Sequence, residues 1–121
     1  MPSPIVFFQI GSLDAPATAA FLRDVFDWSV DASNEALIGI DTGASQVIPN
    51  DIVVSGAIRQ LSSGRAPFTS VYVRVADLDD TLVRAAAHGA RIVVPRTDRP
   101  GQPTVAIIEA PGGHSFGVVQ L

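Results

Sequence analysis

The sequence predicts an α+β protein built from two similar halves, each with one strand, one helix and about three further strands. The chain has 121 residues, of which 47% are hydrophobic, so it is the size of one domain and can bury a core. Two acidic residues that suit helix N-caps, Asp14 and Asp77, stand 63 residues apart. The segments Ser55–Leu61 and Ser115–Leu121 are identical at three of seven positions, at an offset of 60. This repetition of order, spacing and sequence predicts an internal repeat.

The first half begins with Ile5–Ile10, an apolar run with β-branched and aromatic residues that predicts a buried strand ending before Gly11 and Ser12. A helix follows, with Asp14 as its N-cap and Pro16 in its first turn, where a missing N–H costs nothing. Its apolar stripe is expected to consist of Phe21, Leu22, Val25 and Phe26, the last of which lies near its end. Three further strands are expected at Trp28–Val30, Ala36–Ile40 and Ile52–Leu61.

The stretch Ser62–Pro67 is the clearest interruption of these patterns, since it combines Ser, Gly and Pro. We therefore expect a single domain over residues 1–121, with a first module at about 1–61, a linker at 62–67 and a second module at about 68–121. The second module repeats the element order of the first.

Valines alternate with polar residues over Ser70–Val75, so this strand is expected to pack one face and to leave the other for function or solvent. Asp77 can N-cap the next helix, with Asp80 three residues on as in a capping box, and Gly89 is its expected stop. Its apolar stripe is expected to be Leu78, Leu82 and Ala85. The remaining strands are expected at Ile92–Val94, Val105–Ile108 and Phe116–Gln120. The loop Pro95–Pro103, which carries Arg96 and Arg99, is either a lid or a simple exposed connection.

Composition excludes several classes of protein. The net charge is −4 and the isoelectric point about 4.8, which argues against a nucleic-acid partner, because such proteins carry basic surfaces. The chain has no cysteine, so disulfides, thiolate metal sites and thiol nucleophiles are ruled out. No apolar stretch is long enough to span a bilayer and no signal peptide is evident, so no membrane partner and a cytoplasmic location are expected.

Three segments resemble a known family. FFQIGSLDAPATAAFLRDVFDW, VYVRVADLDDTLVRAAAHGARIVVP and IIEAPGGHSFGVVQ are similar to the opening of the first module, the opening of the second module and the closing hairpin of the vicinal oxygen chelate (glyoxalase/bleomycin resistance protein/dioxygenase) superfamily. The resemblance covers nearly the whole chain. It implies two βαβββ modules that form a curled mixed sheet around a cleft, and by analogy a homodimer, whose cleft lies within one chain or between two.

The resemblance also implies four positions at which relatives hold a divalent metal. They fall on Phe7, Ser70, Gly117 and a residue near Ala57, which offer no good donor set, so no metal and no other cofactor is expected. The two histidines, His88 and His114, are expected to be structural, and Glu35 and Glu109 are isolated from both.

The strand period of two places the cleft residues on the same strand faces as those four positions. The predicted ligand-binding residues are Phe7, Gln9, Arg59, Ser70, Tyr72, Arg74 and Gly117, with Ala57 and Val119 beside them. Arg74 can bind an oxyanion, or else it pairs with a nearby Asp or lies in water. Tyr72 can orient a ligand by hydrogen bonding, or else it is a half-buried core residue.

The function expected from these residues is metal-independent binding of a small aromatic or anionic molecule. A metal-dependent lyase or dioxygenase of the same superfamily is the first alternative, and an accessory protein without a ligand is the second. Whether the chain is an enzyme stays open, and no catalytic residue is assigned, because no predicted cleft side chain ordinarily titrates near neutral pH.

Overall fold

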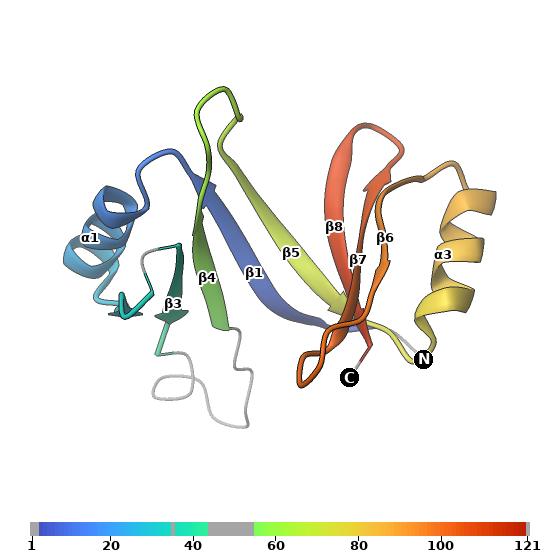
Figure 1. Ribbon diagram of the computed structural model, residues 1–121, viewed down its shortest axis with the longest axis horizontal. Coiled ribbons are helices and arrows are strands. Elements are labelled where there is room, and N and C mark those ends of the chain that lie inside the picture. The colour runs from blue at the N-terminus through green and yellow to red at the C-terminus, as the bar shows by residue number, and fades with distance from the viewer. Residues whose placement is uncertain (1–2, 35, 44–54, 121) are drawn as a thin grey trace. The chain divides into compact units, whose positions relative to one another are not determined.

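The computed structural model describes residues 3–34, 36–43 and 55–120 (Figure 1). The chain divides into two compact units, which we name by their helices: the α1 unit, Phe7–Thr69, and the α3 unit, Met1–Val6 with Ser70–Leu121. The element order is strand, helix and three strands, twice over. The α+β class and the two βαβββ modules expected from the sequence are therefore confirmed.

The α1 unit contains a mixed four-stranded sheet and one helix. Its strands lie in the order β2-β3-β4-β1, with β1 parallel to β4 and the other neighbours antiparallel. The elements are β1 (Ile5–Ser12), α1 (Ala15–Phe26), β2 (Ser29–Asp31), β3 (Leu37–Asp41) and β4 (Ser55–Gln60). The first three residues of the expected strand Ile52–Leu61 lie outside the described residues.

Helix α1 packs on one face of this sheet and forms the core of the unit. The buried core residues are Ala15, Ala19, Leu22, Ile38, Ile40 and Ile58, with Phe8, Ile10, Trp28 and Val30 packed against them. The expected apolar stripe of the helix is wrong at three of its four members, because Phe21, Val25 and Phe26 are 57%, 58% and 52% exposed. The alanines and Leu22 allow the helix to lie close to the sheet, and the ring of Phe26 instead contacts the rings of Phe21 and Trp28.

The α3 unit has the same plan. Its strands lie in the order β5-β8-β7-β6, with β5 parallel to β8 and the other pairs antiparallel. The elements are β5 (Phe68–Arg74), α3 (Leu78–Ala87), β6 (Arg91–Thr97), β7 (Thr104–Ala110) and β8 (His114–Gln120). The buried core consists of Val75, Leu78, Ala106 and Val118, and the partly buried Leu82 confirms the expected stripe of α3. Neither helix in the described part of the chain is long and apolar enough to cross a membrane.

Most strand ends differ from the expectation by one to three residues. Strand β1 continues through Gly11 and Ser12, because these residues pair with Arg59 and Gln60 of β4. Strand β6 runs on to Thr97, so the connection expected at Pro95–Pro103 begins three residues later, at Asp98. The pairing of β6 with β7 shifts register twice, and such irregularities on an edge strand accommodate a proline that cannot donate a ladder hydrogen bond.

The predicted helix ends are confirmed. The Asp14 carboxylate accepts a hydrogen bond from the backbone N–H of Ala17, and the Asp77 carboxylate accepts one from Asp80. Helix α3 ends at Ala87 with His88 as its C-cap, and the next residue, Gly89, has a φ of +91° in the left-handed region that favours glycine. The N–H of Ala90 then donates to the carbonyl of Ala85, as in a Schellman motif.

The internal repeat has a structural basis in a pair of glutamines. Gln60 Oε1, at the end of β4, accepts a hydrogen bond of 2.8 Å from the N–H of Ala15 at the start of α1. Gln120 Oε1, at the end of β8, accepts one of 2.7 Å from the N–H of Leu78 at the start of α3. Each module therefore uses the same glutamine of the repeated heptapeptide to bind its helix to the end of its last strand.

Replacement of Gln120 by Ala is expected to lower the free energy of unfolding by about 1 kcal/mol, because the N–H of Leu78 loses its acceptor. Urea denaturation followed by circular dichroism measures the loss. Gln102→Ala is the matched control, since this residue is exposed and bonds through its backbone to Arg99. Equal losses in the two variants would contradict this role of Gln120.

Candidate functional site

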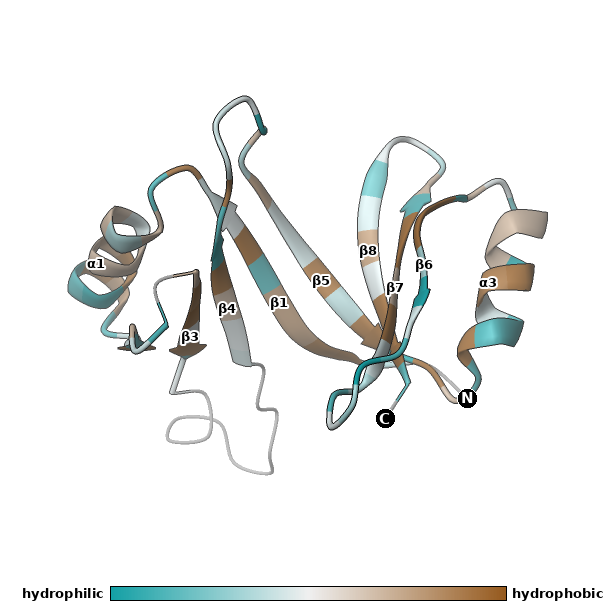
Figure 2. Cartoon of the chain, viewed as in Figure 1, coloured by the Kyte–Doolittle hydropathy of each residue, from teal (hydrophilic) through white to brown (hydrophobic). Residues whose placement is uncertain are grey.

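Each sheet has one face toward its helix and one face away from it, which we call the helix-proximal and helix-distal faces. Side chains alternate between them along every strand. Figure 2 shows this alternation along β5 as successive hydrophobic and hydrophilic bands. In that strand Val73 packs against the helix-proximal core, so Tyr72 and Arg74 lie on the helix-distal face.

The strand register places two rows of residues on the helix-distal face of the α3 unit. One row runs from Tyr72 through Gly117 to Ile107, and the next runs from Arg74 through Val119 to Val105. Val119 is buried, whereas Val105 and Ile107 keep part of their side chains exposed. Four predicted site residues therefore share this face: Ser70, Tyr72, Arg74 and Gly117.

The ring of Tyr72 lies directly across Gly117. A Cβ atom added at Gly117 would lie only 2.5 Å from Cδ2 and Cε2 of the ring. The glycine thus allows the ring to lie flat against the neighbouring strand.

Arg74 lies at the end of β5 and is exposed. Its backbone N–H donates to the carbonyl of Pro4 at 2.9 Å. Within residues 3–34, 36–43 and 55–120, no carboxylate lies within the 4.0 Å that defines an ion pair with its guanidinium. Among the described residues no aspartate pairs with Arg74, and its exposure at the strand end agrees with the alternative in which it lies in water.

The other predicted site residues lie on the helix-distal face of the α1 unit. Gln9 pairs with Ala57, and Gly11 pairs with Arg59. Phe7 and Gln9 alternate with Phe8 and Ile10, which pack against the helix-proximal core. Phe7, Gln9 and Arg59 are thus brought together on one face, and the predicted set falls into two groups, one in each unit.

The residues do not fit a metal site. The positions that the family resemblance implies carry a phenyl ring, a methyl group, a hydroxyl and a glycine, at Phe7, Ala57, Ser70 and Gly117. Among the described residues, no three His, Cys, Asp or Glu side chains gather closely enough to hold a metal ion. Glu35 lies outside the described residues. The four positions therefore lack the donor chemistry that a metal ion needs.

The segment expected as a lid or connection is tied to helix α3 by one ion pair and holds a second within itself. Arg96 donates to Asp79 at 2.7 Å and to Asp98 at 3.2 Å. The pKa of Asp98 is lowered, first by the hydrogen bond from Thr104 and then by the one from Arg96. Asp98 and Asp79 in turn raise the pKa of Arg96. Arg96 is therefore engaged in structural contacts, and a lid movement of this loop stays a prediction.

The described residues also line two cavities, neither of which the sequence predicted. One, of about 590 Å³, lies in the α1 unit where β1 ends and includes Ser12, Thr18 and Phe68. The other, of about 470 Å³, lies in the α3 unit between helix α3 and the helix-proximal face of its sheet. Arg84 and His88 of α3 line the second cavity, and their spacing of four residues was the signal available in the sequence.

Comparison with solved structures shows the same fold in proteins of low sequence identity. A hypothetical protein from Bacillus halodurans C-125 has a TM-score of 0.68 and 8% identity over 100% of this chain and 96% of that chain. A glyoxalase/bleomycin resistance protein/dioxygenase superfamily member from Vibrio splendidus 12B01 has a TM-score of 0.66 and 16% identity over 98% of each chain. Methylmalonyl-CoA epimerase from Mycobacterium tuberculosis has a TM-score of 0.60 and 16% identity over 96% of this chain and 86% of that chain.

No curated protein matches this sequence. The family model described as Glyoxalase/Bleomycin resistance protein/Dioxygenase superfamily matches residues 5–118, which is nearly the whole chain. The repeated βαβββ modules agree with this match. The chain therefore belongs to the glyoxalase/bleomycin resistance protein/dioxygenase superfamily.

Proposed function

We propose that this protein binds a small organic anion without a metal, on the helix-distal face of the α3 unit. The observation that carries the proposal is Arg74. Its guanidinium has no carboxylate partner among the described residues, and it lies in a row with Val119 and Val105. A cation next to an apolar surface suits a ligand with a carboxylate and an apolar body.

Tyr72 and Gly117 support the same proposal. The Tyr72 ring lies across Gly117 in the row next to Arg74, so an aromatic side chain stands beside the cation on this face. The hydroxyl of Ser70 lies further along the same face of β5. We assign these residues to ligand binding, with Arg74 as the anchor for the anionic group.

The metal-independent part of the proposal rests on the donor set. A Lewis-acid site needs several oxygen, nitrogen or sulfur ligands, and the family's metal positions in this chain supply only the Ser70 hydroxyl. One structure of the same fold is described as methylmalonyl-CoA epimerase in complex with methylmalonyl-CoA and NH4+, at 12% identity and a TM-score of 0.65. Methylmalonyl-CoA carries a carboxylate, so this fold can accommodate a ligand of the proposed class.

The proposal predicts that benzoate, as a probe, binds in the presence of a metal chelator and perturbs the amide signals of Tyr72, Arg74 and Gly117 in an NMR titration. Arg74→Ala is expected to weaken benzoate by about 10- to 100-fold, because a charge-assisted pair of hydrogen bonds is lost. Arg65→Ala is the matched control, since Arg65 is exposed in the segment between β4 and β5. The neutral analogue benzamide should bind more weakly than benzoate.

Equal benzoate affinity in the wild type, Arg74→Ala and Arg65→Ala would overturn the role of Arg74. Binding that appears only after a divalent metal is added would favour the metal-dependent alternative. Arg59→Ala in the same titration measures the predicted contribution of the helix-distal face of the α1 unit. We also propose that the protein is a cytoplasmic homodimer.

A further inference from the structure

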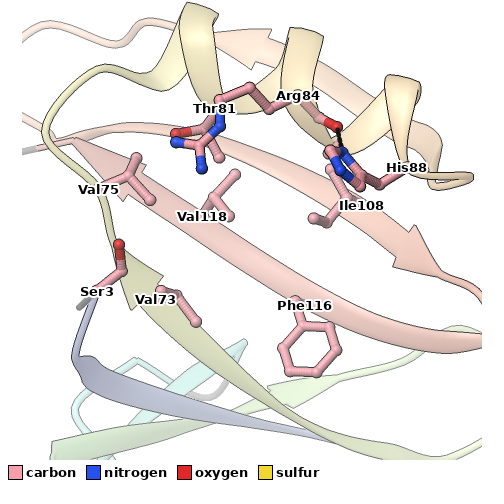
Figure 3. Close-up of a pocket in the computed structure, with 10 residues that line it drawn as sticks. Ser3, Val73, Val75, Thr81, Arg84, His88, Ile108, Phe116 and Val118 are labelled. Atoms are coloured by element: carbon pink, nitrogen blue, oxygen red, sulfur yellow. Dashed lines mark hydrogen bonds between the residues drawn. The ribbon is translucent and has the colours of Figure 1, made fainter. Parts of the chain in front are cut away.

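We infer that the cavity under helix α3 is a second ligand site, one that takes a small aliphatic carboxylate. It has a volume of about 470 Å³, within the usual range for small-molecule pockets. It lies on the helix-proximal face of the sheet, opposite the face proposed above to bind benzoate. Its strand residues therefore alternate along β5 and β8 with Tyr72, Arg74 and Gly117. Figure 3 shows the side chains from β5 and β8 that form its floor below the helix.

The floor of this cavity is apolar. Val73 comes from β5 and Val75 directly follows that strand, while Phe116 and Val118 come from β8. Val75 and Val118 also belong to the buried core, with 8% and 3% of their surface exposed, so the floor is rigid. An aliphatic chain laid on this floor would remove apolar surface from water, which favours binding.

Arg84 supplies the charge that the apolar floor lacks. In Figure 3 its side chain runs back along α3 and directs the guanidinium over Val118 toward Val75. Its ion-pair partner is Asp80, at 3.9 Å, and the side chains of Arg84 and Asp80 are 75% and 60% exposed. A pair so long and so exposed is weak, so the guanidinium can turn to a ligand carboxylate at little cost.

The other polar groups fix where the carboxylate lies. The Thr81 hydroxyl donates to the carbonyl of Asp77, and His88 Nδ1–H donates to the carbonyl of Arg84, because a carbonyl can only accept. His88 is the C-cap of α3, where the carbonyl groups at the helix end repel an anion. The carboxylate is therefore placed at Arg84, and the aliphatic end of the ligand points along the floor toward Phe116.

Octanoate is the probe that tests this site, with the methyl groups of the wild-type protein observed by NMR. We expect saturable shifts of the helix-proximal methyl groups of Val73, Val75 and Val118. Arg84→Ala should weaken octanoate by about tenfold or more. Ala85→Leu, which adds bulk to the cavity lining without removing a charge, should weaken it as well, and Arg65→Ala is the matched control.

Shifts confined to helix-distal methyl groups such as those of Val105 and Val119, or an affinity unchanged by both Arg84→Ala and Ala85→Leu, would overturn the second site. Shifts of Val73 and Val118 that follow protein concentration without octanoate would show that a second copy of the chain covers this floor, which would also overturn it. Because benzoate binding is measured through Tyr72, Arg74 and Gly117, failure of one site is distinguishable from failure of the other.

Discussion

Replacement of Leu78 by Ala is expected to lower the free energy of unfolding by about 2–5 kcal/mol, the largest loss among the substitutions considered. Leu78 is the first residue of α3 and is fully buried. Its side chain belongs to the core cluster with Val75, Ala106 and Val118. Ala106 lies in β7 and Val118 in β8, so Leu78 packs the start of the helix against the sheet. The truncation would leave a cavity that this rigid cluster cannot close.

Urea denaturation followed by circular dichroism measures this loss. Val83→Ala is the matched control on the same helix, because Val83 is 70% exposed and its truncation should change stability by no more than about 0.5 kcal/mol. Similar midpoints for Leu78→Ala and Val83→Ala would show that α3 is not held to its sheet by Leu78.

Gly56→Ala is expected to destabilise the protein by about 1–3 kcal/mol, because an added methyl group would overlap the Phe8 ring. Gly56 pairs with Phe8 in the parallel ladder of β4 and β1 and is buried. The ring packs against the core of the α1 unit and contacts the ring of Trp28 at a centroid distance of 5.9 Å. It therefore has little room to move aside.

The fluorescence of Trp28, the single tryptophan of the chain, reports directly on this packing during urea denaturation. Gly39→Ala is the matched control in the neighbouring strand β3, where the nearest atom to an added Cβ is Asp31 Cβ at an ordinary 3.7 Å. This control should be neutral or stabilising by up to about 1 kcal/mol, since alanine has less backbone freedom to lose. A Gly56→Ala protein as stable as Gly39→Ala would contradict the close packing of Phe8 on Gly56.

The repeat was the part of the fold most readily predicted, because local chemistry determines it. Asp14 and Asp77 can each satisfy a backbone N–H at a helix start, and Gly89 can adopt the left-handed conformation that ends a helix. These interactions need only nearby residues, so a single sequence reveals them. The role of Gln60 and Gln120 was visible only as sequence identity, because each bonds to a helix far away along the chain.

The errors concern features that depend on tertiary packing. The periodicity of α1 suggested that Phe21 and Val25 were buried, but the small residues Ala15 and Ala19 face the sheet. Gly11 and Ser12 have poor strand propensity, yet pairing with β4 keeps them in β1.

The same distinction applies to the candidate site. The period of two along β5 was enough to place Tyr72 and Arg74 on the same face. The cavity under α3 could not be predicted, because it depends on how the helix lies over the sheet, and the sequence shows only that Arg84 and His88 are one turn apart.

Native mass spectrometry of the untagged protein, as purified, is the most direct test of metal-independent binding by this protein. It reports the mass of the assembly, any stoichiometric metal and any small molecule carried through purification. The predicted result is a dimer without a stoichiometric divalent metal, accompanied by an organic anion that Arg74→Ala loses. A stoichiometric divalent metal that leaves only with a chelator, together with loss of the organic ligand, would contradict the proposal and favour metal-dependent chemistry.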